Sequence, residues 1–252
     1  MTKERIKGVN YVASLSCGKD SLAMVLRLIK ENYPLTHVVF YDTGMEYDAI
    51  YTNLDKIEVL LSKKNITLKI IRPKNDFLTD MLLRPVNEGK STEHYGYEWC
   101  GGCCRWRTSD KIALINKYLD TLGEYIQYIG IAADEPQRVR AEKNKIYPLV
   151  EWNMSEKDCL SYCRKHGYNW KEGSYDLYDL LDRVSCWCCA NKNLKELRNM
   201  YHFLPKYWGF LKGMQSRIDR PFHSGKTIFK LEERFRSEDA QLSLFDVFEI
   251  EN

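Results

Sequence analysis

Hydrophobic and polar positions along the first part of the chain predict strands and helices in alternation. Residues 9–13 form a short apolar run that favours a β-strand. Over 22–29, apolar residues recur at i, i+3, i+4 and i+7, which is the pattern of one helix face. Further strand-like runs follow at 36–41, 68–71 and 125–131. Because strands that alternate with helices pack into a parallel sheet covered on both faces, this pattern predicts a doubly wound α/β fold.

The remaining periodic segments predict helices. One lies between the second and third strands, with Ile50, Leu54, Ile57 and Leu61 on one face, and another has Ile112, Ile115 and Leu119 on one side. Two more are predicted at 193–203 and 205–218, and Ser155-x-x-Asp158 is typical of a helix start. A glycine-containing loop at 84–106 is long enough to suggest a function.

The segment order predicts three parts of the chain. Residues 1–150 are expected to form the nucleotide-binding α/β domain, and 151–236 a helical appendage that carries cysteines. Residues 237–252 lack helical periodicity, so we expect a flexible tail.

Composition narrows the class of protein. The chain has 252 residues, of which 44% are hydrophobic, yet no apolar run approaches the roughly 20 residues that a membrane span needs. The first residues lead into no hydrophobic signal core, so we expect a cytoplasmic protein without a membrane anchor. In that setting, nine cysteines indicate metal binding or catalysis rather than disulfides.

Charge is unevenly distributed in the carboxyl-terminal part. Residues 190–236 contain 11 Lys and Arg against 4 acids, whereas 237–252 contain 5 acids and no Lys or Arg. The basic segment is compatible with a nucleic-acid surface, including DNA. An ordinary solvated helical surface explains the charge equally well.

A polar loop joins the first strand to the first helix: Ser14-Leu15-Ser16-Cys17-Gly18-Lys19-Asp20-Ser21. The first amides of a helix have no internal acceptor, and the helix dipole is positive at that end. Small residues let a phosphate approach those amides, and Lys19 adds a positive charge. The loop therefore predicts a phosphate-binding site, although its spacing is not that of a Walker A loop. The simpler alternative is a turn that contains a capping serine.

This loop resembles the PP-loop of the ATP pyrophosphatase and sulfonucleotide reductase superfamily, written Ser-Gly-Gly-Lys-Asp-Ser. Cys17 stands where that motif has its first glycine, and a cysteine resists backbone angles that glycine permits. The resemblance implies nucleotide binding, often with cleavage of ATP between its α and β phosphates.

Charged residues follow two other predicted strands. Asp42-Thr43-Gly44 resembles the second motif of the same superfamily, although a single aspartate at a strand end is often only a helix cap. After the fourth strand come Asp134, Glu135, Arg138 and Arg140, which suit Mg²⁺ and phosphate. Ligands of such sheets bind beyond the carboxyl ends of the strands, where all these residues are expected.

Two cysteine clusters predict a metal centre. Cys100-x-x-Cys103 and Cys186-x-x-Cys189 form two short chelating pairs, with Cys104 as an alternative to Cys103. Four thiolates suit Zn²⁺ or an iron–sulfur cluster, and we favour [4Fe-4S]. The pair Cys103-Cys104 is followed, after 81 intervening residues, by Cys186-x-x-Cys189. A Cys-Cys pair and a Cys-x-x-Cys motif at about this spacing resemble the cluster pattern of assimilatory adenylylsulfate reductases.

Two other interpretations of the cysteines remain. A catalytic dithiol would explain one CxxC motif but leave the second cluster without a role. Buried structural thiols fit Cys159 and Cys163, which fall inside a predicted helix, better than they fit the paired clusters.

Residues from about 9 to 208 are similar to the phosphoadenosine phosphosulfate reductase family. Besides the loop and cysteines, the resemblance rests on Trp99-Cys100, Gly130-Ile131-Ala132-Ala133-Asp134-Glu135 and Tyr147-Pro148-Leu149. True reductases carry a carboxyl-terminal Glu-Cys-Gly-x-His segment, and this sequence has no cysteine after Cys189. The closer resemblance is to the uncharacterised and DNA-sulfurating branches, in which ATP adenylylates a substrate and sulfur then displaces AMP.

The resemblance implies an adenine nucleotide alpha hydrolase-like fold and a set of site roles. The phosphate-binding residues would be Ser14, Ser16, Gly18, Lys19 and Ser21, while Asp20 assists Mg²⁺. Asp42, Gly130 and Asp134 would line the nucleotide pocket, and Arg138 or Arg140 would meet the leaving pyrophosphate. The implied partners are an adenine nucleotide, a sulfur donor protein and DNA. The alternatives are a sulfonucleotide reductase-like enzyme and an accessory protein that binds adenine nucleotide without turnover.

A short motif in the last residues suggests a protein partner. Gln241-Leu242-Ser243-Leu244-Phe245 resembles the peptide that binds the bacterial DNA sliding clamp. Leu244 and Phe245 would enter an apolar pocket of the clamp and supply most of the binding energy. The alternative is that the apolar residues of this segment fold back on the core.

Overall fold

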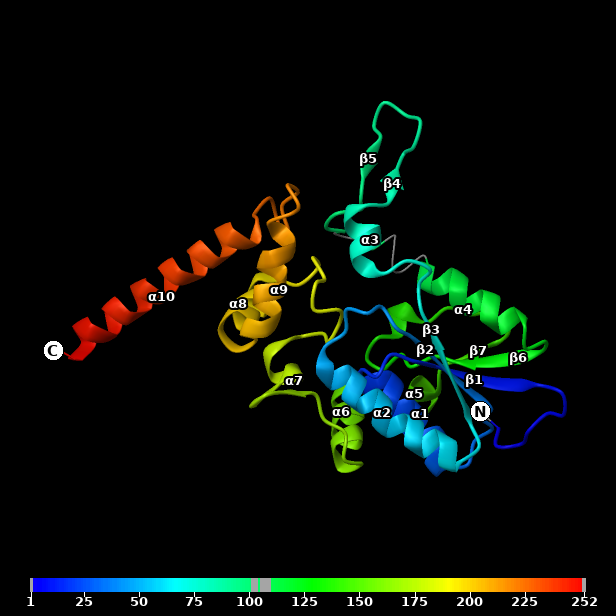
Figure 1. Ribbon diagram of the computed structural model, residues 1–252. Coiled ribbons are helices and arrows are strands. Elements are labelled where there is room, and N and C mark those ends of the chain that lie inside the picture. The colour runs from blue at the N-terminus through cyan, green and yellow to red at the C-terminus, as the bar shows by residue number, and fades with distance from the viewer. Residues whose placement is uncertain (1, 101–103, 105–109, 251–252) are drawn as a thin grey trace. The chain divides into compact units, whose positions relative to one another are not determined.

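The computed structural model describes residues 2–100, 104 and 110–250 (Figure 1). The chain forms two compact units, and each combines two separate segments of sequence. The first unit contains residues 1–74 and 107–177, and the second contains 75–106 and 178–252. This division differs from the continuous parts expected with boundaries at 150 and 236.

A five-stranded parallel sheet forms the centre of the first unit. In spatial order its strands are β3 (Thr67–Ile71), β2 (His37–Tyr41), β1 (Asn10–Leu15), β6 (Tyr125–Tyr128) and β7 (Lys145–Ile146). The four strands predicted from apolar runs are all present. Chain order reverses direction between β1 and β6, and such a reversal is where doubly wound sheets bind ligands.

Helices cover both faces of this sheet, which confirms the predicted doubly wound α/β class (Figure 1). One face carries α1 (Lys19–Lys30), α2 (Asp48–Lys63), α5 (Pro148–Glu151) and α6 (Glu156–Lys165). The four apolar positions that predicted α2 are all buried. Ser155 and Asp158 form the predicted capping box at the start of α6.

Helix α4 (Asp110–Asp120) covers the other face. Ile115 and Leu119 of α4 are buried in a core cluster with residues of β1, β2 and β3. Ile112, predicted to share this face, is 55% exposed. The helix turns Ile112 away from the sheet and toward the pocket described below.

The second unit consists of short helices and a hairpin. Helix α3 (Phe77–Leu82) precedes strands β4 (Pro85–Val86) and β5 (His94–Tyr95), which pair antiparallel inside the segment predicted as a loop. Helices α8 (Leu194–Phe203) and α9 (Pro205–Gln215) confirm the two predicted carboxyl-terminal helices. The remaining short elements of the chain are η2 (Pro136–Arg138), β8 (Lys171–Glu172), β9 (Tyr175–Asp176) and α7 (Leu177–Leu180).

Helix α10 (Ile228–Ile250) extends through most of residues 237–252, although the sequence lacks helical periodicity there. The flexibility of this tail stays a prediction. Phe235 is buried against Tyr201 and Trp208, with ring centroids 5.8 and 6.0 Å away. Arg198 of α8 lies 2.8 Å from Asp239, so ion pairs hold the helix up to that point. The clamp-like segment 241–245 lies in α10, and the clamp interaction stays a prediction.

Among the described residues, no helix combines the length and the apolar character that crossing a membrane requires.

Candidate functional site

The loop between β1 and α1 adopts the sharp turn that its small residues predict. Cys17 has a φ of 56°, the left-handed region in which glycine is the usual residue. The turn is held by a hydrogen bond of 2.8 Å from the indole nitrogen of Trp170 to the Cys17 carbonyl. Cys17 and Trp170 are both fully buried, so the fold supports this backbone conformation although a cysteine occupies the glycine position.

Hydrogen bonds hold three serines of the loop in place. The Ser21 hydroxyl accepts a hydrogen bond from the Ser16 amide at 3.0 Å and lies 2.9 Å from the Ser16 hydroxyl. The buried Gln127 of β6 donates to the Ser14 hydroxyl at 2.9 Å. These bonds fix the positions of three hydroxyl groups before any ligand binds.

Gly130 lies against the first turn of α1. A Cβ atom at Gly130 would come within 2.7 Å of the Ser21 Cα atom and 3.0 Å of the Ser21 nitrogen. Only glycine fits there without displacing backbone, so Gly130 lets β6 and α1 approach each other closely.

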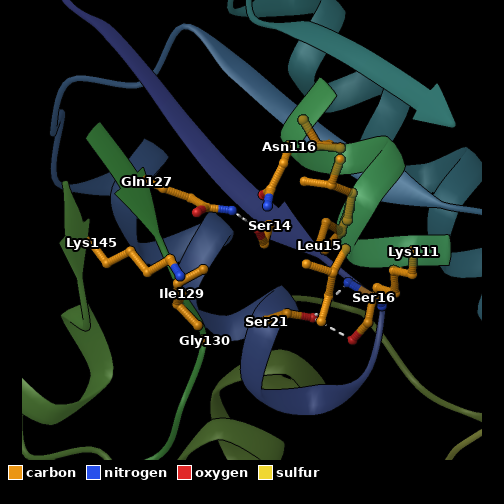
Figure 2. Close-up of a pocket in the computed structure, with 13 residues that line it drawn as sticks. Ser14, Leu15, Ser16, Ser21, Lys111, Asn116, Gln127, Ile129, Gly130 and Lys145 are labelled. Carbon is orange, nitrogen blue, oxygen red and sulfur yellow. Dashed lines mark hydrogen bonds between the residues drawn. The ribbon is translucent and has the colours of Figure 1, made fainter. Parts of the chain in front are cut away.

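A pocket of about 310 Å³ opens beside the loop (Figure 2). It is lined by the loop serines, by Gln127 and Gly130, and by Lys111 and Asn116 of α4 and Lys145 of β7. These last three residues were missed from the sequence. Lys111 and Asn116 lie on α4, which was predicted from its apolar positions alone, so its polar residues were not assigned to a site. Strand β7, which carries Lys145, has two residues and is too short to show the alternation that predicts a strand.

Lys19 does not line this pocket, because it is buried in an ion pair. Its Nζ atom lies 2.7 Å from a carboxylate oxygen of Glu156 and 3.7 Å from one of Asp20. Glu156 stands at the first position of α6 and was not singled out in the sequence.

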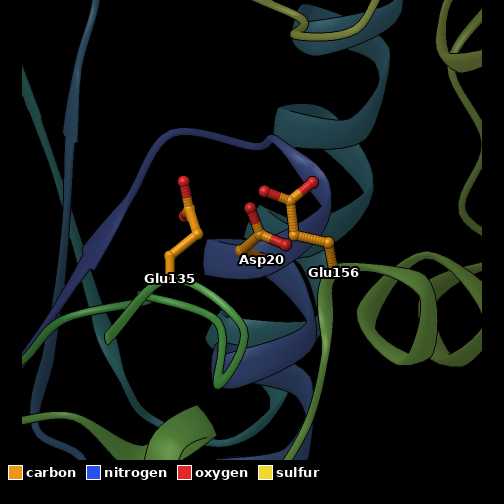
Figure 3. Close-up of side chains that lie close together, drawn as sticks. All are labelled: Asp20, Glu135 and Glu156. Carbon is orange, nitrogen blue, oxygen red and sulfur yellow. The ribbon is translucent and has the colours of Figure 1, made fainter. Parts of the chain in front are cut away.

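Asp20, Glu135 and Glu156 form a group of carboxylates that each offer an oxygen within 4.8 Å of the others (Figure 3). Burial raises the pKa of Asp20 to about 6; Lys19 opposes this effect, and the two glutamates add to it. Among the described residues, no donor forms a hydrogen bond with one of the buried Asp20 oxygens. Hard carboxylate oxygens around such an orphaned atom fit Mg²⁺, which prefers oxygen ligands.

The other acidic residues predicted for the site have local partners. Asp42 accepts hydrogen bonds from the Gly44 amide, the Tyr51 hydroxyl and Arg72, at 2.9, 2.8 and 3.0 Å. Asp134 accepts from the Glu156 amide at 3.1 Å, so it caps the start of α6. Asp134 therefore positions Glu156 in the carboxylate group.

The two predicted arginines follow β6 at the surface. Arg138 forms an ion pair with Glu135, which connects it to the carboxylate group. The backbone of Arg140 exchanges hydrogen bonds with the Tyr147 hydroxyl, at 3.0 and 2.7 Å. Both side chains lie outside the pocket lining.

The second unit contains both predicted metal-binding clusters, because Cys100 belongs to its first segment and Cys186 and Cys189 to its second. Cys103 lies outside the described residues, so the choice between Cys103 and Cys104 stays open. Cys100, Cys104, Cys186 and Cys189 are all partly buried. Among them, no three sulfur atoms come within 4.8 Å of one another.

Aromatic contacts hold the two clusters in place. Trp99, next to Cys100, is 2% exposed and meets the Phe222 ring edge-on at 4.7 Å. The next residue, His223, lies 3.3 Å from the carbonyl of Ala190, which follows Cys189. A short chain of contacts therefore connects the two cysteine segments within one unit.

The surroundings of the second cluster also fit a metal bound by thiolates. The amide of Cys189 donates to the Cys186 carbonyl at 3.1 Å, which closes the CxxC turn. Lys192 is 2% exposed, and its ammonium lies 3.2 Å from the Ser185 hydroxyl. A buried positive charge beside this turn favours anionic thiolates, so the donor set fits Zn²⁺ or an iron–sulfur cluster.

The remaining cysteines are structural. Cys17, Cys159 and Cys163 are fully buried, and burial raises the pKa of each thiol above its ordinary value. Cys163 donates through its thiol to the Lys19 carbonyl at 3.3 Å. This confirms the interpretation of Cys159 and Cys163 as buried thiols of a helix.

Two relatives are similar over most of the chain. An uncharacterized protein of Methanocaldococcus jannaschii is 27% identical over 225 residues, which are 82% of this chain and 41% of the relative. An uncharacterized nin region protein of Escherichia phage lambda is 26% identical over 208 residues, which are 74% of this chain and 67% of the relative. The chain therefore spans less than half the length of the archaeal relative.

A solved structure, the U34-tRNA thiolase NcsA from Methanococcus maripaludis with its [4Fe-4S] cluster, aligns with 91% of this chain and 71% of its own. The TM-score is 0.43 and the identity 12%.

The family comparison covers the sheet, the loop and both cysteine clusters. The model of the phosphoadenosine phosphosulfate reductase domain matches residues 10–190, from the first residue of β1 to the residue after Cys189. The chain therefore belongs to the phosphoadenosine phosphosulfate reductase domain family.

Proposed function

We propose that this chain is a PP-loop enzyme that adenylylates an acceptor oxygen with ATP and then exchanges that oxygen for sulfur. The observation that carries the proposal is the pocket at the end of β1. There, three serine hydroxyls and the two lysines Lys111 and Lys145 line one cavity. Asp20, the neighbour of Ser21 in sequence, belongs to the carboxylate group.

The reaction has two substitutions. In the first, the acceptor oxygen attacks the α-phosphorus of ATP, and pyrophosphate leaves. In the second, a sulfur nucleophile attacks the activated carbon, and AMP leaves with the oxygen. The serine hydroxyls and the two lysines bind and orient phosphate groups, so the chain contributes mainly positioning and charge stabilisation.

Two bound groups are part of the proposal. Asp20, Glu135 and Glu156 would hold Mg²⁺, which when bound neutralises phosphate charge. Cys100, Cys186 and Cys189, with Cys103 or Cys104, would hold [4Fe-4S] or Zn²⁺. The sulfur donor protein belongs to the proposal as well.

The test measures AMP formation from α-labelled ATP under anaerobic conditions, with hydrosulfide as sulfur source and total RNA or genomic DNA as acceptor. We expect AMP from the intact chain and a loss of about 100-fold or more in Asp20→Asn, because a proposed ligand of the Mg²⁺ that neutralises the reacting phosphates is removed. Glu58→Gln, an exposed carboxylate of α2, is the matched control and should retain full activity.

Other outcomes identify the alternatives. ATP binding by calorimetry without AMP from any acceptor would favour the non-catalytic accessory protein. Release of sulfite from a sulfonucleotide in the presence of a thiol would favour the reductase-like enzyme. Either outcome would contradict the proposed adenylylation.

The clamp partner is a separate part of the proposal. A pull-down with purified sliding clamp should retain the intact chain and lose Leu244→Ala/Phe245→Ala. Equal retention of both would remove residues 241–245 as the contact.

A further inference from the structure

Helix α9 and the turn that follows it have an outer face that is largely exposed among the described residues. Lys206, Phe210, Gly213 and Arg217 follow one another at i, i+4, i+7 and i+11, and Gly209 adjoins them. All five are exposed, and Phe210 is exposed to 48%. The opposite face of α9 is buried through Tyr207, Trp208 and Leu211, so the helix is anchored and its outer face is fixed. Tyr207, Trp208 and Leu211 belong to the core of the second unit.

Among the described residues, no close packing requires a glycine at either Gly209 or Gly213. A Cβ atom at Gly209 or Gly213 would meet no atom within 4 Å, and neither glycine has a positive φ. Glycine is the poorest helix former after proline, so the helix carries two unfavourable residues that its own packing does not require. Because Gly209 and Gly213 have no side chains, a ligand could approach the helix backbone closely on both sides of the exposed Phe210 ring.

The segment that carries this face has a local excess of positive charge. From residue 197 to residue 218 the chain has no acid and four Lys or Arg. Arg198 and Lys212 form ion pairs with acids of α10, at 2.8 Å with Asp239 and 2.9 Å with Glu232. Lys206 and Arg217 are exposed at the two ends of this face, with the Lys206 ammonium 5.2 Å from the centre of the Tyr207 ring. Arg217, in the turn after α9, donates to the Gly213 carbonyl at 2.7 Å.

The face adjoins the second cysteine cluster. The Trp187 ring, between Cys186 and Cys188, lies 5.5 Å from the Phe210 ring and 6.1 Å from the Tyr207 ring. A ligand on α9 would therefore lie beside the candidate metal centre of the same unit.

We propose that this face of α9 binds single-stranded nucleic acid. An unstacked base would stack on Phe210, the strand would pass over Gly209 and Gly213, and phosphates would meet Lys206 and Arg217. Aromatic stacking with flanking positive charge is how proteins hold single strands without reading their sequence. A duplex keeps its bases stacked and offers no ring face to Phe210. The identity of this ligand as the sulfur acceptor rests on the proposed function, whereas the binding itself does not.

The experiment measures fluorescence anisotropy of labelled 20-nucleotide oligothymidine and oligouridine with the full chain, without ATP. We expect Phe210→Ala to weaken binding by at least about fivefold, the lower limit for loss of one stacked base. Lys206→Ala and Arg217→Ala should each lower the slope of log affinity against log salt by about 0.7. The oligothymidine and oligouridine arms distinguish a DNA from an RNA ligand.

Gly213→Leu separates loss of binding from loss of folding. Leucine favours a helix and meets open space there, so the variant should unfold at a higher temperature but bind at least about fivefold more weakly. Tyr175→Ala, an aromatic residue that is 42% exposed in the first unit, is the matched control and should bind like the intact chain.

Binding of Gly213→Leu within twofold of the intact chain would overturn the proposal, and so would failure of the intact chain to bind either oligonucleotide. In the second case the face would fit a protein partner instead. AMP formation is measured separately, so oligonucleotide binding without ATP turnover would support this inference while contradicting the proposed function.

Discussion

The loop at residues 14–21 of the first unit and the cysteine segments of the second are held by different kinds of contact. The loop is fixed by hydrogen bonds from distant residues, such as Trp170 to the Cys17 carbonyl and Gln127 to the Ser14 hydroxyl. The cysteine segments are held mainly by ring contacts, such as Trp99 with Phe222. A hydrogen bond fixes direction as well as distance, whereas ring packing tolerates several arrangements.

The difference indicates how each site becomes ready for its ligand. The loop hydroxyls already have defined positions, because the sheet and helices around them supply the contacts. The cysteine segments lie outside regular secondary structure, and thiolates gathered at one site would repel one another without a cation. We therefore expect a metal to complete the fold of the second unit, while the first unit is complete without its nucleotide.

The strongest test of this difference removes the metal. Cys189→Ser should lose the bound metal and loosen the second unit, because structural zinc sites in peptides contribute about 10–16 kcal/mol to folding. Metal analysis and limited proteolysis measure the two effects, and cleavage should fall within residues 75–106 and 178–252. Cys188→Ser, in the same turn but outside the CxxC pair, is the matched control and should keep the metal. Equal metal content in both variants would contradict the assignment of ligands.

The next test disturbs the loop through packing. Gly130→Ala should lower the free energy of unfolding by about 3 kcal/mol, because its Cβ would lie 2.7 Å from the Ser21 Cα atom. Nucleotide affinity should fall with it, since the Ser21 hydroxyl would shift. Urea unfolding and calorimetry measure both, and Gly213→Ala, where a Cβ meets nothing, should not destabilise the chain. An unaltered Gly130→Ala variant would show that the loop is less rigid than we infer.

A third test uses pH. Burial raises the pKa of Asp20 to about 6 from an ordinary 3.8, so the folded state binds this proton more tightly than the unfolded state does. Stability is therefore lost as pH rises from about 4 to about 6. Asp20→Asn should be more stable than the intact chain by about 2 kcal/mol at pH 8, with no gain below pH 4. Urea unfolding at both pH values measures this difference; a gain that is the same at both would rule out titration of Asp20 as its cause.

The smallest effect is expected at Cys17. Cys17→Gly should change stability by less than about 1 kcal/mol, because relief of the left-handed φ of 56° offsets the loss of a buried thiol. Cys17→Ala loses the thiol but keeps the strain, so it should be the less stable of the two variants. Urea unfolding compares them, and equal stability would mean that the backbone angle costs nothing.

Local patterns in the sequence were enough to predict the parts of the site that depend on neighbouring residues. The strand–loop–helix around Ser14–Ser21, the capping box at Ser155 and the two CxxC motifs each follow from short-range chemistry. The phosphate and metal roles of these residues stay predictions until ligands are measured.

The parts that could not be predicted depend on long-range contacts. Glu156 pairs with Lys19 across 137 residues of sequence because α6 packs on α1, and no local signal marks that contact. Lys145 enters the pocket from a strand of two residues. Helix α10 lacks an apolar stripe along its length, and contacts with α8 and α9 stabilise its first half instead.

The residues that support the loop at 14–21 are synthesised much later than the loop itself. Residues 14–21 are among the first to be synthesised, yet their supports are Gln127, Gly130 and Trp170. The loop therefore stays unsupported until most of the chain has left the ribosome. Under the proposed function, nucleotide binding would therefore be acquired late in synthesis, after the residues that support the loop have been added.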